Sequence, residues 1–125
     1  MTAPLALVIE DDSDVATIIA EALKASGFEP QIIQNGNVAL TRLADLTPAV
    51  VVLDMHLPEV SGADILRQIR ADARLEKTRV LVATADPRIA DSIESLADLV
   101  LIKPITFSQV RDLAKRLKPS LPPGR

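Results

Sequence analysis

The chain has 125 residues and a mass of 13.4 kDa, which allows one compact domain with a single hydrophobic core. It contains no cysteine, so disulfides, cysteine-ligated zinc and thiol nucleophiles are excluded. The net charge of −3 argues against non-specific binding to nucleic acid or to an anionic membrane, and we expect neither as a direct partner.

Composition and the first residues suggest the class of protein. Hydrophobic residues make up 48% of the chain but aromatic residues only 2%, which indicates an aliphatic core of buried strands and flanking helices. The apolar run 5–9 ends at once in acidic residues, and no stretch approaches the roughly 18 apolar residues of a membrane span. We therefore expect a soluble, cytoplasmic protein.

Short apolar runs alternate with helical patterns along the whole chain. The expected elements are a strand at 5–9, a helix capped by Asp12 or Ser13 and stopped by Gly27, a strand at 31–33, a helix at 37–45, a strand at 49–53 that ends in Asp54, a helix with Ile65, Leu66 and Ile69 inward, a strand at 79–83, a helix at 87–96, a strand at 99–102, and a helix that Thr106 and Gln109 open and Pro119 ends.

Five strand–helix pairs predict a doubly wound (βα)5 fold, a three-layer sandwich around a five-stranded parallel sheet. In such a fold the carboxyl ends of the strands, and the loops after them, lie at one edge of the sheet. Function should therefore be sought at the strand-to-helix junctions.

Four junctions carry side chains capable of ionic or hydroxyl chemistry: Glu10-Asp11-Asp12, Asp54, Thr84 and Lys103. Taken singly, each has an ordinary structural explanation, such as a helix cap, a turn residue or a solvated charge. Their conjunction at matching strand ends favours a common site. Carboxylates brought together repel unless a cation joins them, and Mg²⁺ is the ion typically held by one or two carboxylates and a phosphate oxygen.

These residues resemble the receiver domain of bacterial two-component response regulators over about residues 3–118. The resemblance rests on four ordered motifs, Leu7-Val8-Ile9-Glu10-Asp11-Asp12, Val51 to Pro58 with Ser61-Gly62 behind it, Thr84-Ala85 and Lys103-Pro104. It implies the flavodoxin-like strand order 2-1-3-4-5 of the chemotaxis regulators.

The resemblance also implies roles for single residues. Asp54 is the expected phosphoacceptor. The expected Mg²⁺ ligands are Glu10, Asp11 and Asp54, with Asp12 as a helix cap. The backbone carbonyl of His56 is expected to be a further protein ligand, while its imidazole is expected only to tune the reaction rate.

The two remaining motifs would complete the switch. Thr84, followed by Ala85, is expected to turn its hydroxyl toward the phosphoryl group, and Lys103 to pair with that group. The Lys103-Pro104 bond is cis in the family, so Pro104 is expected to fix the loop of the lysine.

Two features depart from the family pattern. Val100 stands where the family typically has Tyr or Phe as a second switch element. The interval from Thr84 to Lys103 is also shorter than usual, and Ser95-Leu96-Ala97-Asp98 replaces a glycine-containing turn, so the fourth helix should be short or displaced. We expect intact phosphate sensing with altered coupling to the signalling face.

The expected partners are a histidine kinase or phosphotransfer protein, and a downstream protein or an output domain that the sequence does not contain. A homodimer could form through the fourth helix, fifth strand and fifth helix. We assign residues 1–118 to the receiver domain and 119–125 to a tail or the start of a linker.

Three other functions compete with this interpretation. A receiver-like scaffold would bind a partner without being phosphorylated. A phosphotransferase of the haloacid-dehalogenase type needs a second Asp at position 56, where this chain has His. Nucleotide binding is the third alternative, but the four glycines form no nucleotide-binding motif.

Overall fold

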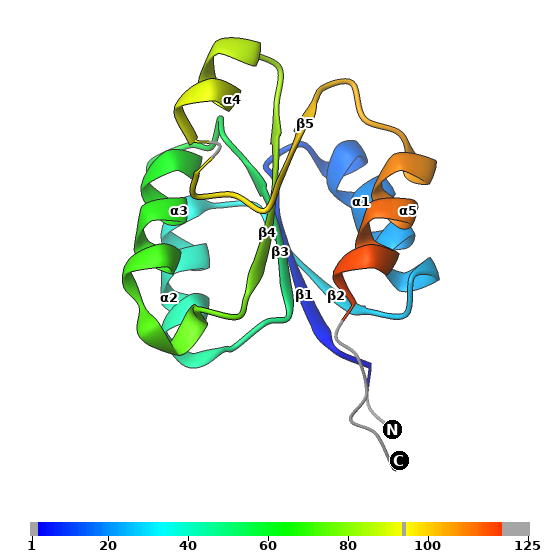
Figure 1. The fold of residues 1–125 in the computed structure, drawn as a ribbon, viewed down its shortest axis with the longest axis horizontal. Coiled ribbons are helices and arrows are strands. Elements are labelled where there is room, and N and C mark those ends of the chain that lie inside the picture. Colours follow the sequence, from blue (N-terminus) through cyan, green and yellow to red (C-terminus); the bar gives the residue numbers. More distant parts are fainter. Residues whose placement is uncertain (1–2, 94, 119–125) are drawn as a thin grey trace.

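The computed structural model describes residues 3–93 and 95–118, and its elements alternate as the sequence predicts (Figure 1). In chain order they are β1 Leu5–Ile9, α1 Ser13–Ala25, β2 Glu29–Ile33, α2 Gly36–Asp45, β3 Val50–Asp54, α3 Gly62–Ala71, the short 3-10 helix η1 Ala73–Leu75, β4 Arg79–Thr84, α4 Pro87–Ile93, β5 Leu99–Ile102 and α5 Phe107–Leu117. The five strands form one parallel sheet in the order β2-β1-β3-β4-β5, which confirms the predicted doubly wound architecture.

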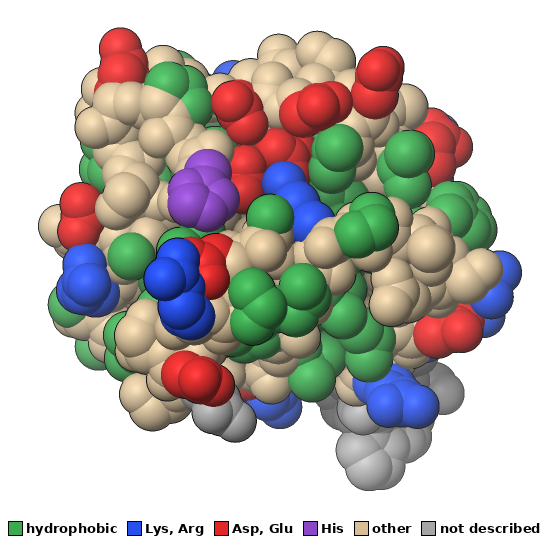
Figure 2. Space-filling model, turned by 90° about the horizontal axis from the view of Figure 1, so that it is seen from above, with side chains coloured by type: hydrophobic (Ala, Val, Ile, Leu, Met, Phe, Trp, Pro, Cys, Tyr) green, Lys and Arg blue, Asp and Glu red, His purple; other side chains and the backbone are tan. Residues whose placement is uncertain are grey.

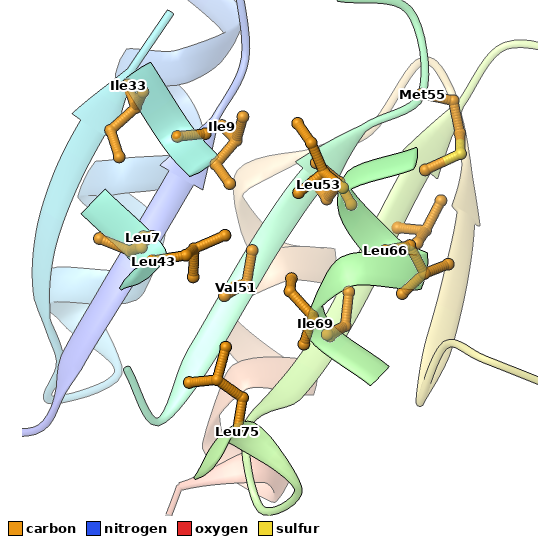
Figure 3. Packing of buried hydrophobic residues seen from close by; sticks show 14 of the residues in the cluster. Leu7, Ile9, Ile33, Leu43, Val51, Leu53, Met55, Leu66, Ile69 and Leu75 are labelled. Carbon is orange, nitrogen blue, oxygen red and sulfur yellow. The ribbon is translucent and has the colours of Figure 1, made fainter. Parts of the chain in front are cut away.

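The sheet separates two aliphatic cores. In Figure 1, α1 and α5 cover one face, and α2, α3 and α4 lie on the other. Because side chains alternate along a strand, β3 sends Val51 and Leu53 toward α2 and α3 and sends Val50 and Val52 toward α1 and α5. Figure 3 shows the core beside α2 and α3, where Leu66 and other apolar residues of the helices meet these strand side chains. Strand β3 is the central strand, all five of its residues are buried, and Asp54 is the last of them.

Two element boundaries differ from the sequence-based expectation by more than one residue. Strand β2 begins at Glu29 rather than at residue 31, and it includes Pro30. This strand lies at the edge of the sheet, where a proline costs the fewest ladder hydrogen bonds. Helix α4 ends at Ile93 instead of residue 96, which confirms a short fourth helix. In the turn that leads to β5, the N–H of Leu96 donates to the carbonyl of Ile93 at 2.9 Å.

The structure confirms the N-caps expected for α1 and α5. The Asp12 carboxylate accepts the N–H groups of Asp14 and Val15 at 2.9 and 3.1 Å, so Asp12 is the N-cap of α1. Thr106 and Gln109 form the expected capping box of α5.

No helix among the described residues has both the length and the apolar character needed to cross a bilayer. The predicted tail, 119–125, lies outside the described residues.

Candidate functional site

The carboxyl ends of β1, β3, β4 and β5 meet at one edge of the sheet and bring Glu10, Asp54, Thr84 and Lys103 there. Viewed from above that edge, Figure 2 shows acidic side chains gathered around a basic one, with the histidine beside them. The spatial cluster that parallel topology predicts is therefore present.

Three carboxylates form the centre of the site. Glu10, Asp11 and Asp54 each place an oxygen within 4.8 Å of the other two. Glu10 is only 1% exposed and Asp54 only 3%, while Asp11 faces solvent. Carboxylate oxygens are the ligands that Mg²⁺ prefers, so this donor set fits that ion.

The ammonium of Lys103 partly neutralises these carboxylates. It lies 2.8 Å from Glu10 Oε1 and 3.4 Å from Asp54 Oδ1. Burial disfavours its charge, but the two neighbouring carboxylates outweigh burial and raise the pKa of Lys103 above its ordinary value. The lysine therefore remains a cation at the site.

Glu10 is the most strongly perturbed acid of the site. Burial raises its pKa from 4.5 to about 7; the hydrogen bond from Lys103 opposes this shift, and the neighbouring Asp54 adds to it. One ammonium thus compensates three clustered carboxylates incompletely. A further cation bound to the cluster would stabilise the ionised forms.

The loop between β3 and α3 folds back over the phosphoacceptor candidate. The N–H of His56 donates to Asp54 Oδ1 at 3.1 Å, while the His56 residue itself is exposed. At the end of the loop, the N–H of Gly62 donates to the carbonyl of Met55 at 3.2 Å. A Cβ at Gly62 would lie 2.2 Å from the Asp54 carbonyl oxygen, so this close return needs a glycine.

Thr84 ends β4 and is completely buried. Its Oγ1 accepts the N–H of Asp86 at 3.1 Å, and its carbonyl accepts the N–H of Lys103 at 2.8 Å. Ala85, the next residue, is exposed. The peptide bond between Lys103 and Pro104 is cis, as expected.

Val100 occupies the middle of β5, opposite Val82 of β4. It is half-buried and packs against the core beneath α2 and α3. An aliphatic side chain in this place is part of the core packing and has no ring that could rotate between the core and solvent.

Polar residues that no sequence motif indicates also order the loops around the site. Asp86 pairs with Arg88 at 3.1 Å at the start of α4, and this pairing lowers the pKa of Asp86. Glu59 bridges the β3–α3 loop to α2. The positive φ of Glu59, 71°, has no signal in the sequence beyond the preceding Pro58.

Comparison with known proteins decides the family. Residues 6–115 match the response regulator receiver domain family. The chain belongs to this family. The acidic cluster of Glu10, Asp11 and Asp54 fits the phosphorylation pocket of a receiver domain.

Two relatives of this receiver domain are longer proteins. The DNA-binding response regulator MtrA of Mycobacterium tuberculosis is 31% identical over 115 residues, which cover 92% of this chain and 49% of MtrA. The transcriptional regulatory protein CutR of Streptomyces coelicolor is 37% identical over 124 residues, which cover 94% of this chain and 56% of CutR. The receiver domain thus spans about half the length of these curated relatives.

Solved structures share the fold of this receiver domain. The chemotaxis response regulator CheY4 of Vibrio cholerae superimposes with a TM-score of 0.84 at 19% identity, covering 93% of this chain and 99% of its own. The receiver domain of the sensor histidine kinase PA1611 of Pseudomonas aeruginosa, described with magnesium in its active site cleft, has a TM-score of 0.81 at 20% identity, covering 93% of this chain and 98% of its own.

Proposed function

We propose that this receiver domain accepts a phosphoryl group on the carboxylate of Asp54 and relays the signal to a partner protein in a phosphorelay. The observation that carries the proposal is the setting of Asp54. It is a nearly buried carboxylate at the end of the central strand, within 4.8 Å of two further acids and 3.4 Å from a lysine ammonium.

The metal of this reaction is proposed to be Mg²⁺. Glu10, Asp11, Asp54 and the backbone carbonyl of His56 would hold it. When bound, the ion supplies positive charge that offsets the charge of the phosphoryl oxygens. The donor set supports this assignment, because it consists of hard oxygen ligands that one lysine compensates incompletely.

The chemistry needs no general base on the protein. An oxygen of the Asp54 carboxylate forms the new bond to phosphorus, while the bond from phosphorus to the leaving group of the donor breaks. The leaving group is a histidine nitrogen when a histidine kinase or a phosphotransfer protein is the donor, and an oxygen or nitrogen when the donor is small. A carboxylate attacks as an anion, so the transfer itself requires no base to remove a proton from the nucleophile.

Lys103 and Thr84 are proposed to stabilise the product. The Lys103 ammonium already lies at the carboxylate and can pair with phosphoryl oxygens. The Thr84 hydroxyl can donate its proton toward the same oxygens and so move the loop that continues through Ala85. The domain would catalyse only its own phosphorylation and dephosphorylation.

Output is proposed to pass through the surface formed by α4, β5 and α5. Ile102 and Phe107 are large apolar side chains that remain 42% and 39% exposed on this surface. Such residues suit a downstream protein, an output domain of a longer chain, or a second copy of this domain. The DNA-binding activity in the name of MtrA belongs to that protein.

The decisive experiment is labelling by a small phosphodonor in the presence of Mg²⁺, followed by intact mass measurement. We expect one phosphoryl group on the wild-type protein and none on Asp54→Asn. Asp64→Asn is the matched control, because Asp64 is exposed on α3 and pairs only with Arg67 among the described residues. Equal labelling of Asp54→Asn would refute the assignment. An unlabelled wild type would favour the scaffold alternative.

A further inference from the structure

A carboxylate held between two amides ties the β3–α3 loop to the start of α2. The Nδ2 groups of Asn35 and Asn37 both donate to Oε2 of Glu59, at 2.7 and 2.9 Å. Oδ1 of Asn35 accepts the N–H groups of Asn37 and Val38 as the N-cap of α2, so the Asn35 side chain is itself fixed. We call these three side chains, Asn35, Asn37 and Glu59, the clamp.

The backbone at Glu59 has a conformation that seldom suits a side chain. Its φ is 71°, and the N–H of Val60 donates to the carbonyl of Pro58 at 2.9 Å, which closes a three-residue turn around Glu59. Turns of this kind are rare and strained for residues other than glycine. The two hydrogen bonds of the carboxylate help to offset that strain.

Packing at Gly36 links the same two loops. A Cβ at Gly36 would lie 2.6 Å from the carbonyl oxygen of Val60 and 2.8 Å from its Cβ. The backbone at the start of α2 therefore lies directly against the residue that follows Glu59. The clamp and this contact hold the β3–α3 loop at its tip.

The other end of the loop contacts the phosphorylation site. His56 donates its N–H to Asp54, and its carbonyl is one of the ligands in the proposed Mg²⁺ site. Gly62 closes the loop against Met55 and Asp54. The His56 carbonyl thus belongs to a segment that is fixed at its base by Gly62 and at its tip by Glu59.

We propose that Glu59, held by Asn35 and Asn37, is a positioning residue that sets the His56 carbonyl for Mg²⁺ binding. This inference rests on the proposed function, because it requires the ion to bind at Glu10, Asp11 and Asp54. Glu59 acts through the loop backbone and does not contact the ion.

Three variants separate the hydrogen bonds of the clamp from the charge of Glu59. Glu59→Gly removes the carboxylate but suits a positive φ. Glu59→Gln removes the charge and keeps an oxygen that can accept from both amides. Asn37→Ala keeps the charge and removes one donor without altering the N-cap residue Asn35.

The measurement is the Mg²⁺ dissociation constant by isothermal titration calorimetry, with amide NMR shifts as a second readout. The chain has no Trp or Tyr that could report binding by fluorescence. We expect Glu59→Gly to raise the dissociation constant about tenfold, the low end for partners of metal ligands, and Asn37→Ala by about twofold, because that variant removes only one of the two donors. Glu59→Gln should change it by less than twofold, as a rescue by the conservative variant. Thermal unfolding without Mg²⁺ measures the stability of each variant, so that lost affinity is not confused with lost folding.

The outcomes distinguish this inference from the proposed function. Wild-type protein that binds no Mg²⁺ overturns both. If the wild type binds the ion, Asp11→Ala abolishes binding and Glu59→Gly binds normally, only the positioning role fails. Equal losses in Glu59→Gln and Glu59→Gly would assign the effect to charge and overturn the clamp. If Glu59→Gly does not fold, Asn37→Ala decides, and unchanged affinity in that variant overturns the inference.

Discussion

The ammonium of Lys103 lies 2.8 Å from Glu10 Oε1, closer than its 3.4 Å separation from Asp54 Oδ1. In this structure the lysine thus makes its shorter contact with the acid beside the phosphoacceptor candidate. If Lys103 paired with a phosphoryl group on Asp54, its ammonium would be shared between that group and the Glu10 carboxylate. The protonation state of Glu10 and the charge at the site are therefore linked.

The first prediction is a pH dependence of stability in the absence of Mg²⁺. Burial raises the folded-state pKa of Glu10 from 4.5 to about 7, so between these values the folded protein binds more protons than the unfolded chain. Glu10 therefore stabilises the folded state fully below pH 4.5, and this contribution to the free energy of unfolding is lost as the pH rises through about 7. Urea unfolding from pH 5 to 8 in a chelator should show this fall. Glu10→Gln should flatten it, and equal slopes for both proteins would contradict the assignment.

The second prediction concerns Mg²⁺ and Asp11. A ligand that binds only the folded state stabilises it, by about 2.7 kcal/mol at a concentration one hundred times its dissociation constant. Mg²⁺ should therefore raise the Tm of the wild type, and Asp11→Ala should lose that rise. Asp14→Ala is the matched control, because Asp14 is an exposed acid in the first turn of α1. A Tm rise that survives in Asp11→Ala would argue that the ion binds elsewhere.

The third prediction is that Arg70 and Asp98 stabilise the start of β5. The Arg70 guanidinium donates to the carbonyls of Leu96 and Thr78 and to Asp98 Oδ2, at 2.7, 3.0 and 2.8 Å. Asp98 also accepts the N–H of Val80 at 2.7 Å. Asp98→Ala leaves the N–H of Val80 and one guanidinium nitrogen of Arg70 without their acceptor, and it should cost about 2–3 kcal/mol in the free energy of unfolding.

Urea unfolding at neutral pH measures that loss. Asp64→Ala, which breaks an exposed pair with Arg67, should cost no more than about 1 kcal/mol. Comparable losses in the two variants would show that the Arg70 and Asp98 contacts add no more stability than a surface ion pair.

The fourth prediction concerns the path of the switch. Thr84 Oγ1 accepts the N–H of Asp86, so movement of the hydroxyl toward a phosphoryl group would act directly on the start of α4. Val100 packs in the core and offers no ring to move. With a beryllofluoride adduct, amide hydrogen exchange should change from Thr84 to Arg88 and change little at Val100. A change at Val100 as large as that at Thr84 would contradict this path.

Much of this protein could be predicted from the order of its residues. Runs of Val, Leu and Ile alternate with helical patterns, and parallel strands bring their carboxyl ends to one edge. Backbone connectivity alone therefore predicted that Glu10, Asp54, Thr84 and Lys103 would lie together. Asp12 and Thr106 could be identified as caps because capping depends on neighbours within the same turn.

Only the tertiary structure decided which polar side chains pair between different elements. The preference of Lys103 for Glu10, the bonds from Asn35 and Asn37 to Glu59, and the contacts between Arg70 and Asp98 all join residues from different elements. Such contacts depend on loop paths and side-chain rotamers, which have no periodic signal in the sequence. The sequence thus determined which residues reach the site, because each one follows the end of a strand. The packing of loops and side chains at the sheet edge determined their hydrogen bonds and the balance of charge.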